Sequence, residues 1–184
     1  MPASISSAQS IFKRDRPRGL AALNEIFCAG SLPNPSPEGE YAGALVALNV
    51  APGITQLAER IAASWIPWKG KFFEPAYSEG ENILSRDSYL LAHLLWPLYR
   101  GYKHVRADRY RAFDFRTYPG PGLMDPDHQV LKLDYNLKSN PRLSVRRVLD
   151  ELVQIDEGVY LGKAHLRWWW GKWQLVAYFS LAKI

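Results

Sequence analysis

The C-terminal part of the sequence concentrates side chains that could carry out chemistry. Residues 159–169 alternate so that Lys163, His165 and Arg167 share one face of an extended strand, opposite apolar residues such as Tyr160. If the cationic face looks into a cavity, it could bind a carboxylate or an enolate and supply a general acid or base. If it looks outward, the cationic heads lie in solvent and the apolar face fills the interior. The spacing leaves both arrangements open.

A second strand pattern adds an acid and a further cation. Residues 129–137 alternate so that Lys132 and Asp134 share one face, opposite leucines and Tyr135. Together with a histidine and a phenol, such a pair could hold and move a proton beside a carbonyl group. The catalytic set predicted from the sequence is Asp134, His165, Lys132 and Tyr178.

Aromatic side chains are the sharpest feature of the composition. They make up 13% of the chain, with seven tryptophans, and large aromatics line apolar cavities and stack on flat ligands. A helix predicted over residues 89–96 would carry two further candidates to the mouth of such a cavity. The predicted ligand-binding set is Tyr41, Lys163, Arg167, Trp68, His93, Trp96 and Tyr135.

Several function classes lack their motifs in this sequence. The four histidines show no close pair and no carboxylate at ligand spacing, which argues against a dedicated metal site. Cys28 is the single cysteine, so no disulfide can form within the chain. No nucleophile elbow and no phosphate-binding glycine loop is present. We therefore expect neither a metal nor a cofactor.

The charge distribution argues against a nucleic-acid partner. The net charge is +5, but four cations against Asp15 within residues 13–18 supply +3 of it, which leaves the remainder nearly balanced. The three tryptophans at 168–170 could stack on single-stranded bases. On a strand, however, neighbouring side chains point to opposite faces and cannot form one stacking platform.

Extended and helical segments must position these groups. Alternating or continuous β-branched and aromatic residues predict strands, and apolar residues at helical spacing predict helices. Residues 140–152 fit a short helix or, as the alternative, a strand. A turn leads into a short predicted strand that ends at Phe73, and a polar loop is expected after it through Gly80. The other predicted strands are 40–50, 110–118, 129–137, 159–169 and 173–181, the last two joined in a hairpin at Gly171 and Lys172, and the predicted helices are 19–29, 54–65 and 89–96.

These elements favour a mainly β fold. We expect a flexible basic arm over residues 1–18 and one domain over residues 19–184, built as an antiparallel β-barrel with short N-terminal and lid helices. The alternative is an α+β sandwich with helices on one sheet. A barrel of about eight strands leaves an interior just wide enough for one small ligand.

Short motifs spread over residues 39–181 carry a family resemblance. They are Gly-Glu-Tyr-Ala-Gly at 39–43, Trp-Lys-Gly-Lys-Phe-Phe at 68–73, Tyr-Arg-Gly at 99–101, Leu-Asp-Tyr-Asn at 133–136 and Tyr-Leu-Gly-Lys at 160–163. In this order they resemble GXWXG-type proteins with a companion C-terminal domain of unknown function, which look like calycins, the lipocalin and nitrobindin-like barrels. The resemblance implies a small barrel around a cavity and no established reaction. A nitrobindin-like barrel would also imply haem, with His165 as the axial ligand.

Two functions follow as hypotheses. The first is binding of a small, largely apolar or aromatic molecule inside the barrel. The second is a cofactor-independent isomerase, cyclase or lyase that moves a proton on that molecule. The sequence has no apolar run of signal-peptide length and no stretch of about 18 apolar residues, which predicts a soluble, cytoplasmic protein without a membrane partner.

Overall fold

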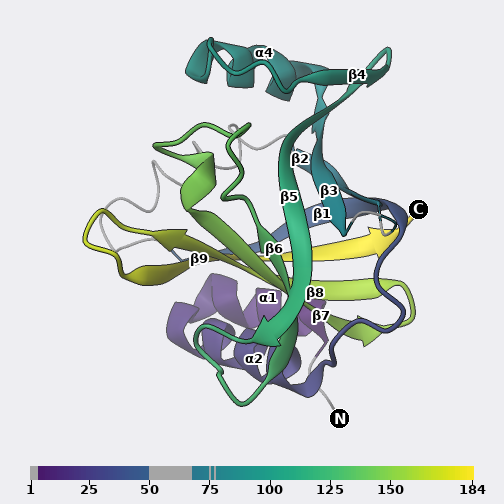
Figure 1. Cartoon of the computed structure of the whole chain (residues 1–184). Helices are drawn as coiled ribbons and strands as arrows, with labels where there is room; N and C mark the ends of the chain where they lie inside the picture. Colours follow the sequence, from purple (N-terminus) through teal and green to yellow (C-terminus); the bar gives the residue numbers. More distant parts are fainter. Residues whose placement is uncertain (1–3, 50–67, 75, 77) are drawn as a thin grey trace.

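The computed structural model describes residues 4–49, 68–74, 76 and 78–184, and its central feature is a closed β-barrel (Figure 1). Nine strands form one sheet in the order β3-β2-β1-β9-β8-β7-β6-β5-β4, and every pairing is antiparallel. Because β3 also pairs with β5, eight strands, all except β4, close into a barrel. The mainly β antiparallel barrel predicted from the sequence is confirmed.

Most neighbours in the barrel are also neighbours in the sequence, so the chain runs up and down around it, and β9 returns to pair with β1. Closure leaves no exposed edge on these eight strands. The strands are β1 (Gly39–Leu48), β2 (Trp68–Glu74), β3 (Glu79–Ser85), β4 (Lys103–Arg106), β5 (Arg109–Pro121), β6 (Gln129–Asp134), β7 (Val148–Asp156), β8 (Val159–Arg167) and β9 (Trp173–Lys183).

Aromatic side chains pack the interior of the barrel. Tyr41 contacts Phe73 and Tyr160 edge to face, with ring centroids 5.5 and 5.4 Å apart, and Phe73 contacts Phe115 in the same way at 5.5 Å. Phe179 belongs to the same buried cluster. Edge-to-face contacts of this kind add to the hydrophobic effect, so they fix which residues face inward on each strand.

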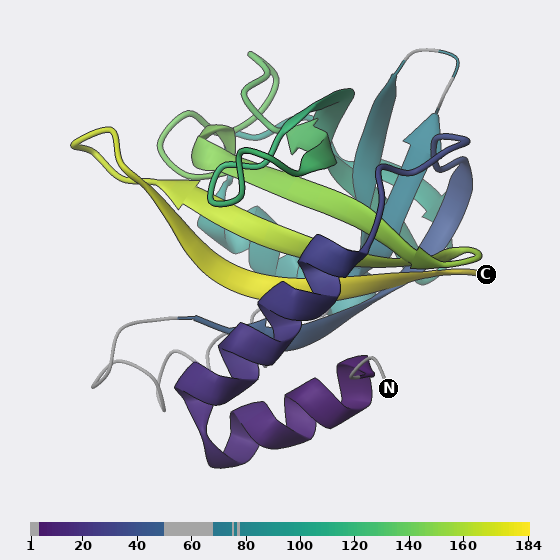
Figure 2. The same ribbon diagram turned by 90° about the horizontal axis from the view of Figure 1, so that it is seen from below.

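Helices α1 (Ile5–Arg14) and α2 (Arg16–Ala29) lie together against the outside of the barrel (Figure 2). Their buried faces, with Phe12 and Phe27, form a second cluster with outward residues of the barrel wall such as Val153. Helix α2 covers the helix predicted over residues 19–29. Helix α1 occupies part of the segment that the sequence analysis expected to be a flexible arm, because its apolar face is buried here.

Helix α4 (Arg86–Leu95) and strand β4 form an arm that projects from the barrel (Figure 1). Tyrosine rings hold α4 against β5 and the residue before β4: the rings of Tyr89 and Tyr110 are stacked with centroids 4.0 Å apart, and Tyr102 contacts Tyr89 edge to face at 5.2 Å. This element corresponds to the helix predicted over residues 89–96.

Two parts of the chain differ from the secondary structure predicted from the sequence, and a third cannot be compared with it. Residues 140–152 do not form a helix of that length: the 3₁₀ turn η2 (Val145–Arg147) is followed by β7, because pairing with β6 and β8 overrides the apolar spacing. Strand β3 begins within a stretch expected to be a polar loop. The helix predicted over residues 54–65 lies outside the described residues.

Within the described parts of the chain, no helix is long and apolar enough to cross a membrane.

A close backbone approach at Gly70 gives a stability prediction. Gly70 has φ +146, and a Cβ built there would overlap the carbonyl oxygen of Tyr41 on the neighbouring strand. We expect Gly70→Ala to lower the free energy of unfolding by about 3 kcal/mol or more, measured by urea denaturation. Gly171→Ala is the control, since φ there is +87 with open space around it, and should cost only about 1 kcal/mol. Equal losses in the two variants would contradict the close approach.

Candidate functional site

Four polar side chains meet inside the barrel, and we call them the Lys71 cluster: Lys71, Asn82, Tyr135 and Asp150. They come from β2, β3, the residue after β6, and β7. Strand alternation turns them inward, because Lys71 is two residues from Phe73 and Asp150 is two residues from Leu152, both of which lie in the interior cluster. Each of the four is at most 9% exposed, so the cluster is sealed from bulk water.

The ammonium group of Lys71 is the centre of the cluster. It donates hydrogen bonds to the side-chain oxygen of Asn82 at 3.0 Å, to the carboxylate of Asp150 at 2.9 Å, and to the hydroxyl of Tyr135. Tyr135 in turn donates to the same Asp150 oxygen at 3.1 Å. Trp68 donates its indole N–H to the Asn82 oxygen at 3.1 Å. All three protons of the ammonium group therefore have acceptors.

Aromatic faces surround the same ammonium group. Lys71 Nζ lies 5.1 to 5.3 Å from the ring centroids of Trp68, Phe115, Tyr135 and Phe179. A cation within about 6 Å of such rings is attracted by their electron-rich faces, most strongly where water is excluded. The pair of Lys71 and Asp150 thus places one positive and one negative charge in an otherwise apolar interior.

Burial sets the protonation behaviour of the cluster. Desolvation lowers the pKa of the Lys71 ammonium group from its ordinary 10.5, and the Asp150 carboxylate opposes this shift. Burial, and then the Asp150 charge, raises the pKa of the Tyr135 hydroxyl well above 10.0. Lys71 therefore loses its proton more easily than an exposed lysine, whereas Tyr135 keeps its proton. Such a pair is suited to general acid and base roles.

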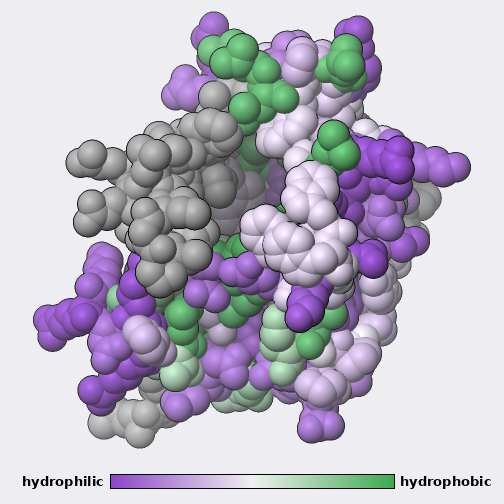
Figure 3. All heavy atoms as spheres, turned by 90° about the vertical axis from the view of Figure 1, so that its left-hand side faces the viewer, coloured by the Kyte–Doolittle hydropathy of each residue, from purple (hydrophilic) through white to green (hydrophobic). Residues whose placement is uncertain are grey.

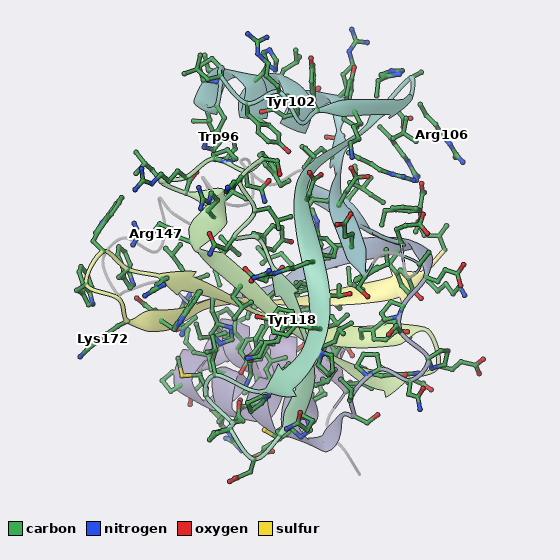
Figure 4. All side chains as sticks on the ribbon, in the orientation of Figure 1. Trp96, Tyr102, Arg106, Tyr118, Arg147 and Lys172 are labelled. Carbon is green, nitrogen blue, oxygen red and sulfur yellow. The ribbon has the colours of Figure 1, made fainter. Side chains whose placement is uncertain are left out.

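At the end of the barrel nearest α4, residues of the arm pack on the interior side chains. Trp96, just after α4, packs edge to face on Phe113 with centroids 5.1 Å apart and donates to the Ser144 hydroxyl at 2.9 Å. Figure 4 shows Trp96 pointing from the arm toward the barrel. Val145 and Val148 are partly exposed and pack against the interior cluster at the same end. In Figure 3 the surface between the arm and the barrel body is hollowed. We call this end the mouth.

Four of the residues predicted to bind ligand lie in or beside the interior. Tyr41 is part of the aromatic packing, Tyr135 belongs to the Lys71 cluster, Trp68 donates to that cluster, and Trp96 lies at the mouth. They come from β1, β2, the end of β6 and the end of α4. The barrel therefore brings together residues that are far apart in the sequence.

Lys132, Lys163, His165 and Tyr178 lie on the outer side of the barrel wall. On β8 it is Tyr160 and Ala164 that pack with the interior cluster, so the face with Lys163 and His165 points outward. Neither residue reaches solvent, because both are 0% exposed beneath other parts of the chain. The sequence left two arrangements open, in which the cations face the cavity or lie in solvent. Lys163 and His165 match neither, because they face away from the cavity and are still buried.

These outward residues form a second buried polar group, which we call the outer cluster. Lys132 donates to Glu151 at 2.6 Å. Lys163 pairs with Asp125, on the β5–β6 connection, and donates to Asn24 of α2 at 2.5 Å. Tyr178 donates to Asn24 at 3.3 Å, and His165 Nε2 lies 3.9 Å from Glu151. The outer cluster thus ties helix α2 to the wall.

The remaining predicted residues lie on the surface. Asp134 pairs with Arg116 on the outer face at 2.7 Å, and Arg167 is exposed at the end of β8. His93 is exposed on α4, where its ring contacts Tyr89. The catalytic set expected from the sequence is therefore not assembled around the interior. None of the four histidines lies in the interior: His165 is on the outward face of β8, His93 and His104 are exposed, and the His128 ring contacts Phe27 of α2. The barrel therefore offers no axial histidine for the haem that the resemblance implied.

Sequence reasoning missed Lys71, Asn82 and Asp150. A signal existed for Lys71, since it alternates with Phe73 in a segment that was predicted to be a strand. The signal for Asp150 was weaker, because its segment was expected to form a helix, with a strand only as the alternative. Because neighbouring side chains on β7 point to opposite faces, Asp150 lies in the Lys71 cluster and Glu151 lies in the outer cluster.

Comparisons of the chain with family models, with curated proteins and with solved structures found no significant match.

The outer cluster gives a pH prediction. Burial lowers the pKa of His165 from 6.5, against the opposing charge of Glu151. The unfolded chain therefore binds a proton near pH 6.5 that the folded chain does not yet bind, so the folded state loses stability as the pH falls below 6.5. We expect this loss to approach about 1.4 kcal/mol per pH unit relative to His165→Gln, from urea denaturation at pH 7.5 and 5.5. His104→Gln, on exposed β4, is the control; identical pH slopes in wild type and His165→Gln would refute the assignment.

Proposed function

We propose that the barrel binds a small, largely apolar or aromatic molecule that carries one oxygen acceptor, such as a carboxylate or a carbonyl group. The single observation that carries the proposal is the ammonium group of Lys71, buried in a closed barrel and ringed by aromatic faces. Ligand sites in proteins are commonly apolar, with a few placed polar groups that fix the orientation of the ligand.

The polar and apolar parts of the interior suit the two ends of such a ligand. Aromatic rings would contact its body, and Lys71 would donate to its oxygen in place of one present acceptor, Asn82 or Tyr135. Asp150 would remain paired with Lys71, so the charge of the amine stays compensated while the ligand is bound. A neutral hydrocarbon without an oxygen would leave Lys71 with its present partners and gain only the apolar contacts.

The resemblance to calycin-like proteins agrees with a ligand inside the barrel, although no family model supports that assignment. Support for ligand binding therefore comes from the geometry of the Lys71 cluster and not from similarity to a known family.

Binding can be tested with a small aromatic carboxylate and its neutral methyl ketone, measured by quenching of tryptophan fluorescence and by calorimetry. We expect Lys71→Met, combined with Asp150→Leu to avoid an unpaired buried charge, to weaken carboxylate binding by about tenfold or more. The control is Lys132→Met with Glu151→Leu, an equally buried pair on the outer wall. Loss of binding in the control but not in the Lys71 variant would overturn the proposal.

A second candidate function is proton transfer on the bound molecule. The observation that favours it is the contact between Lys71, whose pKa is lowered by burial, and Tyr135, whose pKa is raised. After it has lost its ammonium proton to solvent, the neutral amine of Lys71 would take a proton from the carbon beside the carbonyl group and later return one to it, and Tyr135 would donate a hydrogen bond to the developing enolate oxygen. Asp150 would orient both groups.

If the barrel transfers protons, the protons beside the carbonyl group of the ketone should exchange with deuterium from D₂O. This exchange can be monitored by NMR of the ketone. We expect Tyr135→Phe to slow the exchange by about a hundredfold, since one placed proton donor typically contributes that much. Tyr178→Phe, a buried phenol on the outer wall, should leave the rate unchanged. If wild-type protein binds the ketone but exchanges its protons no faster than buffer, the barrel is a binding module and not this enzyme.

A further inference from the structure

An exposed stripe of leucines runs along the projecting arm. Leu90, Leu94 and Leu98 recur every four residues and are 60%, 77% and 86% exposed. The opposite side of α4 carries Tyr89 and Ala92, which pack toward the arm and the barrel. The stripe is therefore not needed to hold the arm together, and large aliphatic side chains at this exposure usually mark a contact surface.

The turn between β8 and β9 exposes a second apolar element. Trp169 and Trp170 are 69% and 65% exposed. The ring of Trp170 is stacked in parallel on Trp168, with centroids 5.2 Å apart, and the guanidinium of Arg147 lies 3.8 Å from the centroid of Trp169. These contacts hold the indole rings in place at the surface, because the chain leaves the strand after Arg167 and turns here.

The two apolar elements lie on the same side of the molecule. In Figure 1 both α4 and the β8–β9 turn extend toward the left of the view, and Figure 4 places Lys172 of the turn and Trp96 of the arm on that side. Figure 3 looks directly onto this side, with hydrophobic side chains at its top edge and the hollow of the mouth below them. We call it the mouth face.

Exposed cations accompany both elements. Arg86 lies one helical turn before Leu90 in the line of the leucine stripe, and Arg100 follows Leu98. Arg167 and Lys172 flank the tryptophans of the turn. All four cations are exposed, and within the described residues no carboxylate lies in ion-pairing distance of them. The mouth face is thus apolar at two points, each flanked by two exposed cations, and Asp87 on α4 is an exposed acid beside Arg86.

We propose that the mouth face docks on an anionic lipid bilayer. Aliphatic side chains enter the acyl region, tryptophans settle at the level of the headgroups, and arginine and lysine pair with lipid phosphates and carboxylates. The proposal goes beyond ligand binding inside the barrel, and it concerns adsorption to a surface rather than a spanning segment. The sequence was expected to have no membrane partner because it lacks long apolar runs. That observation concerns only segments that span a bilayer, not adsorption to its surface.

Two observations favour a bilayer over other partners. A nucleic acid would use free aromatic faces and phosphate contacts; the stacking of Trp168 on Trp170 covers one face of each ring, and the leucine stripe would have no role in such a complex. A protein partner would be expected to meet one continuous apolar patch. Two separate small anchors, each with its own cations, fit a fluid surface that can adapt to both.

Docking can be tested by co-sedimentation of the full chain with vesicles, which requires no interior ligand, so its outcome is independent of the proposed ligand. We expect binding to vesicles of phosphatidylcholine with 30% phosphatidylserine in the dilute-salt range, about 0.1 M, where charges are screened over about 10 Å. Binding should fall at least tenfold on vesicles of phosphatidylcholine alone. A blue shift of the tryptophan emission should accompany binding, because Trp169 and Trp170 leave water.

Paired variants separate the two contributions. Leu94→Ser with Leu98→Ser should weaken binding about tenfold through lost apolar contact, and Arg86→Glu with Arg100→Glu at least about fivefold per site. Lys183→Glu with Ile184→Ser is the matched control, since Ile184 is 70% exposed at the C-terminus on the other side of the molecule, and should bind as wild type does. No binding to phosphatidylserine vesicles overturns the proposal, as does equal weakening in the control. Tighter binding to a single-stranded oligonucleotide, unaffected by the leucine changes, would assign the face to nucleic acid instead.

Discussion

The ion pair of Lys71 and Asp150 is the constraint on which the interior of this protein depends. A buried ammonium group is tolerated only when it is paired and fully hydrogen-bonded, and three acceptors, from β3, from β7 and from the residue after β6, meet this need. The pair therefore restricts where β2, β3 and β7 can lie around the barrel. An apolar core of the same volume would impose no such polar requirement, which is why the cluster is the natural place to look for function.

Strand alternation explains how one barrel wall serves two clusters. Asp150 and Glu151 are adjacent on β7 and point to opposite sides, the first into the Lys71 cluster and the second to Lys132. The interior cluster is surrounded by aromatic rings, whereas the outer cluster is shared with α2 and the β5–β6 connection. Similar residue types thus form a polar cluster in the interior on one side and fasten a helix on the other.

Residues at the mouth join the projecting arm to the interior packing, through the contact of Trp96 with Phe113. Helix α4 and the β8–β9 turn, which carry exposed leucines and tryptophans, extend toward the same side of the barrel. If an apolar molecule enters the barrel, it must pass from a place where it is soluble to a place where it is bound. A mouth that faces lipid would make this transfer without crossing water, so the two proposals fit one physical picture while each stands on its own observations.

The sequence by itself determined the class of fold. The alternation of residues 129–137, the C-terminal hairpin and the scarcity of long helices were enough to predict an antiparallel barrel, because side-chain period depends only on local geometry. It also selected Tyr135 and Trp68, which the structure places in and beside the Lys71 cluster. Only the tertiary structure decided the direction of each face. Lys163 and His165 turn outward and stay dry because α2 and the β5–β6 connection, distant in sequence, cover them, and Asp150 reaches Lys71 because barrel closure joins strands separated by 79 residues.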